Sequence, residues 1–390
     1  MVDAEYESLR NRVVMGPGSV DRVADEVRRL GASRVMLISG ARTAKTNLVA
    51  RVSNALGPLL VENFNSVVEH SGTHIVEEAA ERAASSQVDL LLPVGGGSSS
   101  DTAKGVAILL SEGAPLKKHA NQFIPPSTLI QQQLNQPKLP ILAIPTTASA
   151  AEVTPGLGIR DADGQKLLFW DAKVAARTIL LDPDALLEVP PPLLATSGMN
   201  ALAHCIEGLY SKKRNPIAEG FALQGLRLLA RGLPVAVSRK ENLEARSQVL
   251  YGAHLSGMTI ASTRTCLHHG ICHVLGALGG LAHGTANSIM LPHVMRFNSR
   301  VSASELKLAA QALGADVGGL SDDEASEAAI AAIVRLQQAL GVTLRLRDTP
   351  LKRDLLPRIA DHAMRDRAIY FNPGPALTSE EVLKVLDAAW

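Results

Sequence analysis

Five histidines in the second half of the chain are spaced so that they can meet at one point. They form the histidine cluster, which consists of His204, His268, His269, His273 and His283. Asn200 lies four residues before His204, and His269 lies four residues before His273. Residues four apart share one face of a helix, so each pair projects in a single direction. Imidazoles gathered in this way either bind a metal ion or transfer protons.

Two chemistries are open to this cluster. In the first, iron or zinc binds four ligands, namely Asn200, His204, His269 and His283, and His273 is left to contact the substrate. A divalent ion favours ligands that neutralise part of its charge, whereas an amide among three neutral imidazoles supplies none. We therefore expect the second chemistry, catalysis without a metal. Individual histidines of the cluster are also compatible with hydrogen-bonded positions in a core.

Imidazole titrates near neutral pH, which suits it to proton transfer. We predict that His273 polarises the substrate and donates the proton, with His269 or His204 as its partner in a relay.

A glycine-rich segment in the first half is typical of a phosphate-binding turn. It follows an apolar run and opens into a helical pattern from Gly105 to Ser111. Glycines let the backbone approach a ligand, and amide groups at a helix start suit a diphosphate. The predicted cofactor ligands here are Gly95, Gly96, Gly97, Ser98, Ser99 and Asp101. The spacing matches neither a Walker motif nor GxGxxG. A serine-capped turn, with Asp101 favouring the helix dipole, is the simpler alternative.

A second polar loop, from Pro145 to Pro155, follows the next apolar run. Ligands of a parallel sheet bind beyond the carboxyl ends of its strands, so the two loops should line the same crevice. We expect the hydroxyl groups of Thr146 and Thr147 to bind the cofactor's phosphate or amide groups.

The elements that position these residues alternate in the first half, as in a parallel sheet flanked by helices. The predicted helices are Val20 to Leu30, ended by Gly31, and Thr73 to Ser86. The predicted strands are Val35 to Ser39, Val88 to Val94, Ile141 to Pro145 and Thr178 to Leu181. Residues 114–138 are polar, contain Pro125 and Pro126, and are predicted to be a surface loop or a short helical insertion.

The second half is predicted to be all α-helical, with a strong helical pattern from Glu324 to Leu340. Three prolines, at positions 190 to 192, interrupt the alternating pattern because proline lacks an N–H donor and fixes φ. We therefore predict an α/β domain at residues 1–189 and an α-helical catalytic domain at residues 190–390.

Composition restricts the function further. The chain has 390 residues, 46% of them hydrophobic, and a net charge of +1, so no overall field attracts nucleic acid or a membrane. Its three cysteines suggest a reducing compartment, and Cys266 and Cys272 are expected to pack as small apolar groups. Residues 1–12 lack the apolar core of a signal peptide, and no run is long enough to span a bilayer. We expect a cytoplasmic enzyme of small molecules.

Taken together, these residues resemble the iron-containing alcohol dehydrogenase superfamily, and most closely its maleylacetate reductases. The resemblance rests on GGGSSSDTAK, PTTASAAEVTP, Lys166, LLDPDAL, SGMNALAHCIEGLY, LHHGICHVLG, AHG and LPHV, and covers most of the chain. It implies a dehydroquinate synthase-like fold, with an α/β dinucleotide-binding domain, an all-α carboxyl-terminal domain, and a cleft between them where NADH or NADPH meets the substrate. A homodimer is also implied.

The reductase branch is favoured by two details. Asn200 replaces the ligating aspartate of the metal enzymes, and His268 with His269 forms a doublet typical of the reductases. By resemblance, those reductases work without metal and reduce maleylacetate to 3-oxoadipate in the catabolism of aromatic compounds. The resemblance also implies that Lys166 contacts the cofactor and that Tyr370 lies near the active site.

Other positions depart from this branch. Gly270 and Gly374 stand where basic residues are expected, and a dianionic substrate needs cations. Arg264, just ahead of the cluster, is expected either to supply such a cation or to be a surface charge.

After the first predicted strand, Gly40 and Ala41 stand where dehydrogenases often have an aspartate that excludes the 2′-phosphate of NADPH, and Arg42 comes next. Because this acid is absent, we predict the use of both NADH and NADPH.

Two other functions stay open. The first is a metal-dependent alcohol or aldehyde dehydrogenase that tolerates Asn200. The second is a nucleotide-binding protein without turnover.

Overall fold

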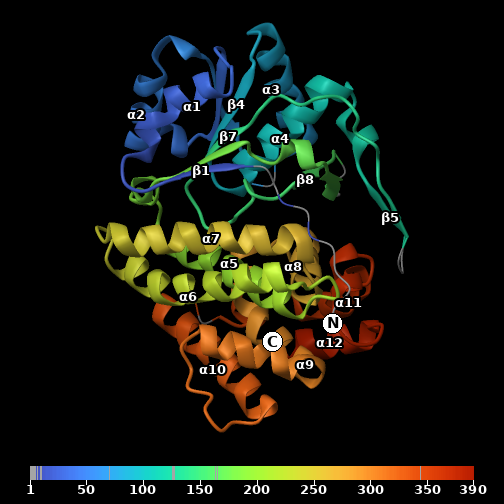
Figure 1. Ribbon diagram of the computed structural model, residues 1–390. Coiled ribbons are helices and arrows are strands. Elements are labelled where there is room, and N and C mark those ends of the chain that lie inside the picture. The colour runs from blue at the N-terminus through green and yellow to red at the C-terminus, as the bar shows by residue number, and fades with distance from the viewer. Residues whose placement is uncertain are drawn as a thin grey trace. The chain divides into compact units, whose positions relative to one another are not determined.

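The computed structural model describes residues 6, 8, 11–69, 71–124, 128–162, 164, 166–342 and 344–390 (Figure 1). The chain divides into two compact units. One comprises Ser8–Gln122 and Ile130–Val189, and the other comprises Met1–Glu7, Phe123–Leu129 and Pro190–Trp390. Within the described residues, no helix has both the length and the apolar character needed to cross a membrane. Most of the predicted amino-terminal segment, residues 1–5, 7, 9 and 10, lies outside the described residues, as do Pro125 and Pro126.

A parallel sheet forms the centre of the first unit. Its strands lie in the order β1, β10, β7, β4, β2, β3. Their bounds are β1 Arg12–Met15, β2 Val35–Gly40, β3 Leu60–Val67, β4 Leu90–Gly95, β7 Leu142–Pro145 and β10 Thr178–Leu181. Every residue of β4, β7 and β10 is buried, which is why these strands are continuous apolar runs. All four predicted strands are therefore confirmed. The edge strands β1 and β3 were not predicted. β1 has only four residues, one of them buried, and β3 is polar and half-exposed.

Helices cover both faces of this sheet (Figure 1). Alternate residues of β4, Leu90, Leu92 and Val94, pack in one hydrophobic cluster with α1 (Val23–Arg29) and α2 (Asn47–Leu56). α3 (Thr73–Ser85) and α4 (Gly97–Glu112) pack together, and α4 contacts β4 and β2. The predicted first helix begins as a 3-10 turn, η1 (Ser19–Arg22), and ends before Gly31, whose φ is +75°. The α/β expectation for this half is confirmed.

Short elements fill the connections. A two-stranded sheet pairs β8 (Gly156–Arg160) with β9 (Lys166–Trp170), and another pairs β5 (Gln122–Ile124) with β6 (Thr128–Ile130). The 3-10 helices are η2 (Thr43–Lys45), η3 (Gly57–Leu59), η4 (Leu116–His119), η5 (Ala172–Val174) and η6 (Pro183–Leu186). Residues 114–138 thus hold the expected helical turn, η4, but also the strands β5 and β6, which are too short to show a period.

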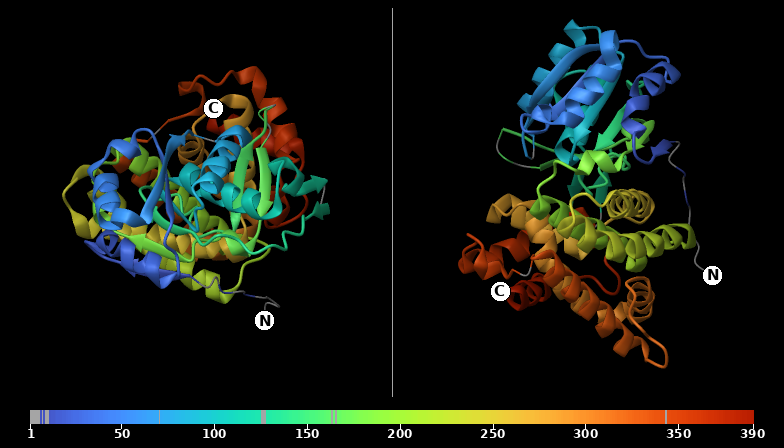
Figure 2. Two further views of the ribbon diagram at one scale, coloured as in Figure 1. Left: turned by 90° about the horizontal axis from the view of Figure 1, so that it is seen from above. Right: turned by 90° about the vertical axis from the view of Figure 1, so that its left-hand side faces the viewer.

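The second unit is built from helices, as predicted, and Figure 2 shows it from two further sides. Its helices are α5 (Pro191–Tyr210), α6 (Pro216–Ser238), α7 (Leu243–Thr263), α8 (Leu267–Gly279), α9 (His283–Ala312), α10 (Asp322–Leu340), α11 (Leu356–Ala363) and α12 (Ser379–Ala389). Its 3-10 helices are η7 (Leu346–Asp348), η8 (Arg353–Leu355) and η9 (Arg367–Phe371). Pro191 and Pro192 occupy the first turn of α5, where a missing N–H costs nothing, so they begin this helix.

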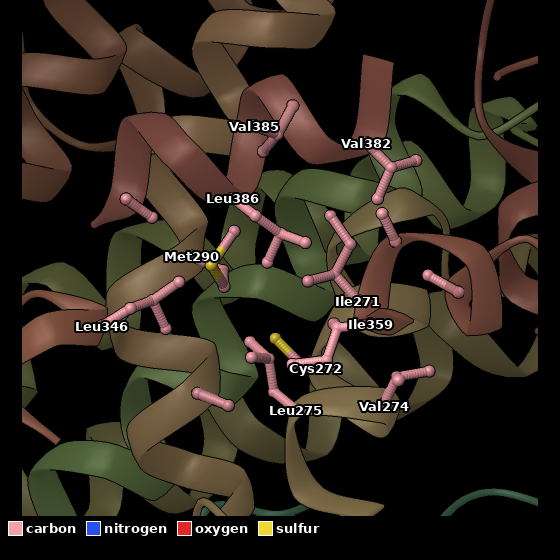
Figure 3. Packing of buried hydrophobic residues seen from close by; sticks show 14 of the residues in the cluster. Ile271, Cys272, Val274, Leu275, Met290, Leu346, Ile359, Val382, Val385 and Leu386 are labelled. Carbon is pink, nitrogen blue, oxygen red and sulfur yellow. The ribbon is translucent and has the colours of Figure 1, made fainter. Parts of the chain in front are cut away.

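One apolar face of α8 is held in the core of this unit (Figure 3). The side chains that meet there include Ile271, Cys272 and Leu275 of α8, Met290 of α9, Ile359 of α11 and Leu386 of α12. Cys272 is fully buried in this cluster, which confirms its predicted packing role. Burial of several apolar side chains on one face fixes the rotation of α8 about its axis, and with it the direction of the histidines on the other faces.

Candidate active site

α5, α8 and α9 bring the five predicted histidines together around His269. The centre of the His269 ring lies 4.8 Å from that of His204, 5.0 Å from His268, 5.7 Å from His283 and 6.0 Å from His273. The His273 and His283 rings also stack, 5.8 Å apart. The helical spacings in the sequence therefore predicted correctly which side chains converge.

Burial increases from His273 inward. The side chain of His273 is 20% exposed, that of His269 is 3% exposed, and that of His268 is fully buried. Burial lowers the pKa of His268 to about 4 and holds the pKa of His204 well below its usual value, so both are neutral at physiological pH. His273 is thus the most exposed of these three histidines.

A buried carboxylate that sequence reasoning missed holds His269 in place. Glu207 is fully buried, and its Oε1 accepts hydrogen bonds from the backbone N–H groups of Cys266 (2.9 Å) and His269 (3.3 Å). Its Oε2 accepts a hydrogen bond from Nδ1 of His269. Glu207 thereby caps α8, whose own N-cap, Cys266, makes no side-chain capping bond. Burial raises the pKa of Glu207. Its position seven residues after Asn200, on the same helical face, was the available signal.

Asn200 and His269 bind each other. Nε2 of His269 donates to Oδ1 of Asn200 at 3.1 Å, and Nδ2 of Asn287 donates to the same oxygen at 2.9 Å. Nε2 of His268 donates to the backbone oxygen of Asn287 at 3.0 Å. In this arrangement the Asn200 oxygen accepts two N–H groups, and both ring nitrogens of His269 face oxygen atoms.

These contacts decide how well the predicted set suits iron or zinc. A metal ligand must offer a free lone pair, yet Asn200 and His269 satisfy one another, and the set of Asn200, His204, His269 and His283 carries no negative charge. The ligand atoms of Glu207, His268 and His269 lie within 4.8 Å of one another, so these three residues form a second possible metal site. There, however, Oε1 of Glu207 accepts two backbone N–H groups and its Oε2 accepts from His269. In this arrangement Asn200, His269 and Glu207 are therefore engaged in hydrogen bonds within the protein.

A second carboxylate, Asp366, supports His273. Nδ1 of His273 donates to Oδ2 of Asp366 at 2.8 Å, while Oδ1 of Asp366 caps η9 by accepting from the Ala368 N–H at 2.8 Å. This hydrogen bond fixes the tautomer and the orientation of the ring, with the proton of Nδ1 directed at Asp366 and Nε2 left as the acceptor nitrogen. The two residues lie 93 positions apart in the chain, so no local pattern could have paired them.

The two glycines that depart from the reductases both have structural reasons. A Cβ at Gly270 would lie 2.8 Å from Cγ1 of Ile369, so the glycine lets η9 pack directly on α8. Gly374 has φ +78°, which favours glycine over arginine. Tyr370, by contrast, is 49% exposed, and its ring contacts Phe371.

In the first unit, the two predicted cofactor loops lie side by side. They follow the paired strands β4 and β7, and the Thr146 N–H donates to the Gly95 oxygen at 2.9 Å. A Cβ at Gly96 would lie 3.0 Å from Oγ1 of Thr147. Gly96 is the N-cap of α4 and offers no side-chain cap, so the first-turn N–H groups suit a phosphate. This cradle fits a nucleotide diphosphate. The strand order reverses between β4 and β2, and ligands of such sheets bind at this point. The exposed Arg42 follows β2 directly after Ala41.

The other predicted cofactor residues have protein partners here. Asp101 accepts a hydrogen bond from the Gly158 N–H at 3.1 Å and lies 3.8 Å from Nζ of Lys104. A Cβ at Gly158 would collide with the side chain of Lys166, so Lys166 lies across β8 near Asp101. The buried Lys104 donates to the backbone oxygens of Ala151 (2.5 Å) and Gly156 (2.7 Å), which ties the second loop to α4. Ser98 and Ser99 lie in the first turn of α4.

Fold and site together define an oxidoreductase of the iron-containing alcohol dehydrogenase type. Residues 10–183 match the family described as iron-containing alcohol dehydrogenase, and residues 194–390 match its carboxyl-terminal domain, described as Fe-containing alcohol dehydrogenase family, C-terminal. The chain therefore belongs to the iron-containing alcohol dehydrogenase family, as its motifs predicted.

Among relatives, maleylacetate reductase 2 of Cupriavidus pinatubonensis is 35% identical over 97% of this chain and 94% of that protein. Lactaldehyde reductase of Escherichia coli is 29% identical over 98% of this chain and all of that protein. A solved structure of 1,3-propanediol oxidoreductase superposes with a TM-score of 0.92 at 29% identity, covering 99% of this chain and all of that one. These relatives share the fold and differ in the substrates that their names state.

Proposed function

We propose that this protein is a metal-independent reductase of maleylacetate, or of a related unsaturated keto acid, that uses NADH or NADPH. The observation that carries this proposal is the mutual hydrogen bond of Asn200 and His269, because it occupies two of the four side chains that would otherwise bind a metal. The similarity to maleylacetate reductase 2 supports the substrate class.

The chain's own groups would act as follows. The N–H groups at the start of α4, from Gly97 onward, hold the diphosphate of the cofactor, with Thr146 and Thr147 beside them. The nicotinamide cofactor supplies a hydride ion when bound. His273 donates from Nε2 the proton that completes the saturated product, and Asp366 orients its ring by accepting from Nδ1.

His269 acts behind His273 as part of a fixed polar network. Glu207 and Asn200 hold its two ring nitrogens, so its orientation does not vary while His273 changes its protonation state. Burial keeps His204 neutral beside it, at a ring distance of 4.8 Å. Arg42, exposed after β2, is proposed to tolerate the extra phosphate of NADPH.

The test measures oxidation of NADH and NADPH with maleylacetate before and after exhaustive chelation, with metal content determined on the same sample. We expect activity with both cofactors that survives chelation. The matched variant is Asn200→Asp, which restores an anionic ligand beside His269. We expect it to bind a divalent ion more tightly than the parent chain does. Wild-type activity that requires added iron or zinc would refute the proposal.

A second candidate is a metal-dependent alcohol or aldehyde dehydrogenase. It is favoured by the full-length similarity to lactaldehyde reductase and by the absence of basic side chains at Gly270 and Gly374. It predicts turnover of an aldehyde, lost on chelation, and none with maleylacetate. A role in aromatic catabolism, a homodimeric state and a cytoplasmic location are proposed with the first function.

A further inference from the structure

The second cofactor loop, residues 145–155, is held near both of its ends. Its start continues strand β7, which pairs with β4. Near its end, Nζ of Lys104 in α4 donates to the backbone oxygens of Ala151 at 2.5 Å and of Gly156 at 2.7 Å. A charged donor makes stronger hydrogen bonds than a neutral one, so these two contacts fix the end of the loop to α4.

Lys104 is a cation in a buried position, because its side chain is only 1% exposed. Burial lowers the pKa of Lys104, whereas the charges of Asp101 and Glu152 act in the opposite direction. Nζ of Lys104 lies 3.8 Å from Oδ1 of Asp101, so a carboxylate balances part of its charge. An apolar side chain would fill this space without removing an ammonium group from water. What the ammonium group adds is the pair of hydrogen bonds to the loop.

The loop lies along the start of α4, where its hydroxyl groups face the glycines of the helix. A Cβ at Gly96 would lie 3.0 Å from Oγ1 of Thr147, and a Cβ at Gly97 would lie 3.6 Å from Oγ of Ser149. Lys104 follows Gly97 by about two helical turns, so both project from the same face of α4. The helix that offers its first-turn N–H groups to a phosphate thus also carries the group that binds the loop.

The loop also has a backbone conformation that needs support. Ala150 has φ +58°, in the left-handed region that is unfavourable for a residue with a Cβ. Such conformations persist where the surrounding structure holds them. Ala150 is fully buried, and the next carbonyl group, that of Ala151, is one of the two that Lys104 binds. Without the ammonium group, the loop would lose a contact directly beside this residue.

We propose that Lys104 is a positioning residue for the cofactor, which holds the second loop against α4 and so keeps the hydroxyl groups of Thr147 and Ser149 beside the first turn of the helix. Lys104 is too deeply buried to meet the cofactor, so it acts through the loop. A loop that occupies the binding position for only part of the time lowers the apparent affinity in proportion. The inference rests on the nicotinamide cofactor of the proposed function and is independent of the substrate and of a metal.

The test compares the wild type with Lys104→Met, which keeps an unbranched side chain and removes the ammonium group. NADH is titrated by fluorescence, without substrate and after chelation, at a temperature at which circular dichroism shows both proteins to be folded. We expect the Kd for NADH to rise by about 10- to 100-fold, since two charge-assisted contacts to the loop are lost. Hydrogen exchange of the backbone amides of residues 146–153 should become faster. An unchanged Kd would overturn the inference, as would a raised Kd with unchanged exchange in the loop.

Lys173→Met is the matched control. Lys173 also donates to a backbone oxygen, that of Leu134 at 2.7 Å, and its side chain is 43% exposed. It lies in η5, outside the loop, so we expect the Kd for NADH to stay close to the wild-type value. An equal rise in both variants would exclude the proposed role, because the loss would then not be specific to the loop.

If Lys104→Met does not fold, the double variant Asp101→Asn, Lys104→Met is compared with Asp101→Asn alone. Asparagine keeps an oxygen for the Gly158 N–H, and removing both charges leaves neither group buried without its partner. The same rise in Kd is expected between these two proteins, and equal values would contradict the inference. A wild type that does not bind NADH would refute the proposed function as well, whereas equal binding by the wild type and Lys104→Met refutes the inference alone.

Discussion

Replacing Glu207 by glutamine tests whether one buried carboxylate both starts α8 and orients His269. Glutamine keeps an oxygen that can accept from the N–H groups of Cys266 and His269. Its other atom, however, is an amide nitrogen, which donates and cannot accept from Nδ1 of His269. His269 must then present an unprotonated Nδ1 and carry its proton on Nε2, facing Asn200.

The size of the effect follows from the contacts that change. A hydrogen bond to a charged group contributes roughly 1.5–3 kcal/mol, and Glu207 loses one such bond in a fully buried position. The neutral amide avoids the desolvation that raises the pKa of Glu207, which limits the loss. We expect the free energy of unfolding to fall by about 1–3 kcal/mol. Turnover should fall by about 10- to 1000-fold, because His269 loses the proton on Nδ1 and with it one of the two hydrogen bonds that orient its ring.

The assays are chemical denaturation and the pH profile of kcat with the preferred substrate. The control is Glu78→Gln, which makes the same change at an exposed position of α3. A loss of stability with an unchanged kcat and pH profile would mean that Glu207 only caps the helix. No change in either quantity would refute the described role of the carboxylate.

Three further predictions concern single residues. His273→Ala should lower kcat by about 100- to 1000-fold while NADH affinity, followed by fluorescence titration, changes little, and an equal loss of both would contradict its role as proton donor. Burial raises the pKa of Glu152 to about 7 from 4.5, so the folded state holds the extra proton and stability is lost as pH rises through this window. That gap corresponds to roughly 3 kcal/mol, which Glu152→Gln should remove in urea denaturation at pH 5 and 8, and a pH dependence kept by the variant would contradict it. Gly270→Ala should cost about 1–3 kcal/mol of unfolding free energy, and Ile369→Ala should recover part of it; additive losses would show that the two do not clash.

Local patterns were sufficient for most of the fold. The buried strands β2, β4, β7 and β10 were predicted because continuous apolar runs of this length occur in the centre of parallel sheets. The polar edge strand β3 and the three-residue strands β5 and β6 were missed, because their residues show no period that distinguishes a strand from a loop. Pro191 and Pro192 were interpreted as an interruption of the alternating pattern, although they form the first turn of the helix α5.

The sequence by itself determined the family and the convergence of the histidines. Spacing of four residues places Asn200 with His204, and His269 with His273, on single helical faces wherever those helices lie. The glycine turn after a buried strand likewise indicated a phosphate site, since it needs only a strand, a turn and a helix start that are adjacent in the chain. Each of these features depends on neighbours within one or two turns.

Only the tertiary structure decided what the cluster's nitrogens bind. The pairing of His273 with Asp366 and the shared hydrogen bonds of Asn200, His269 and Asn287 join residues from helices that are far apart in the sequence. Such contacts depend on how α5, α8, α9 and η9 pack, which is set by buried apolar faces and by the absence of a side chain at Gly270. Spacing predicts direction within one helix, whereas hydrogen-bond partners across helices require their packing.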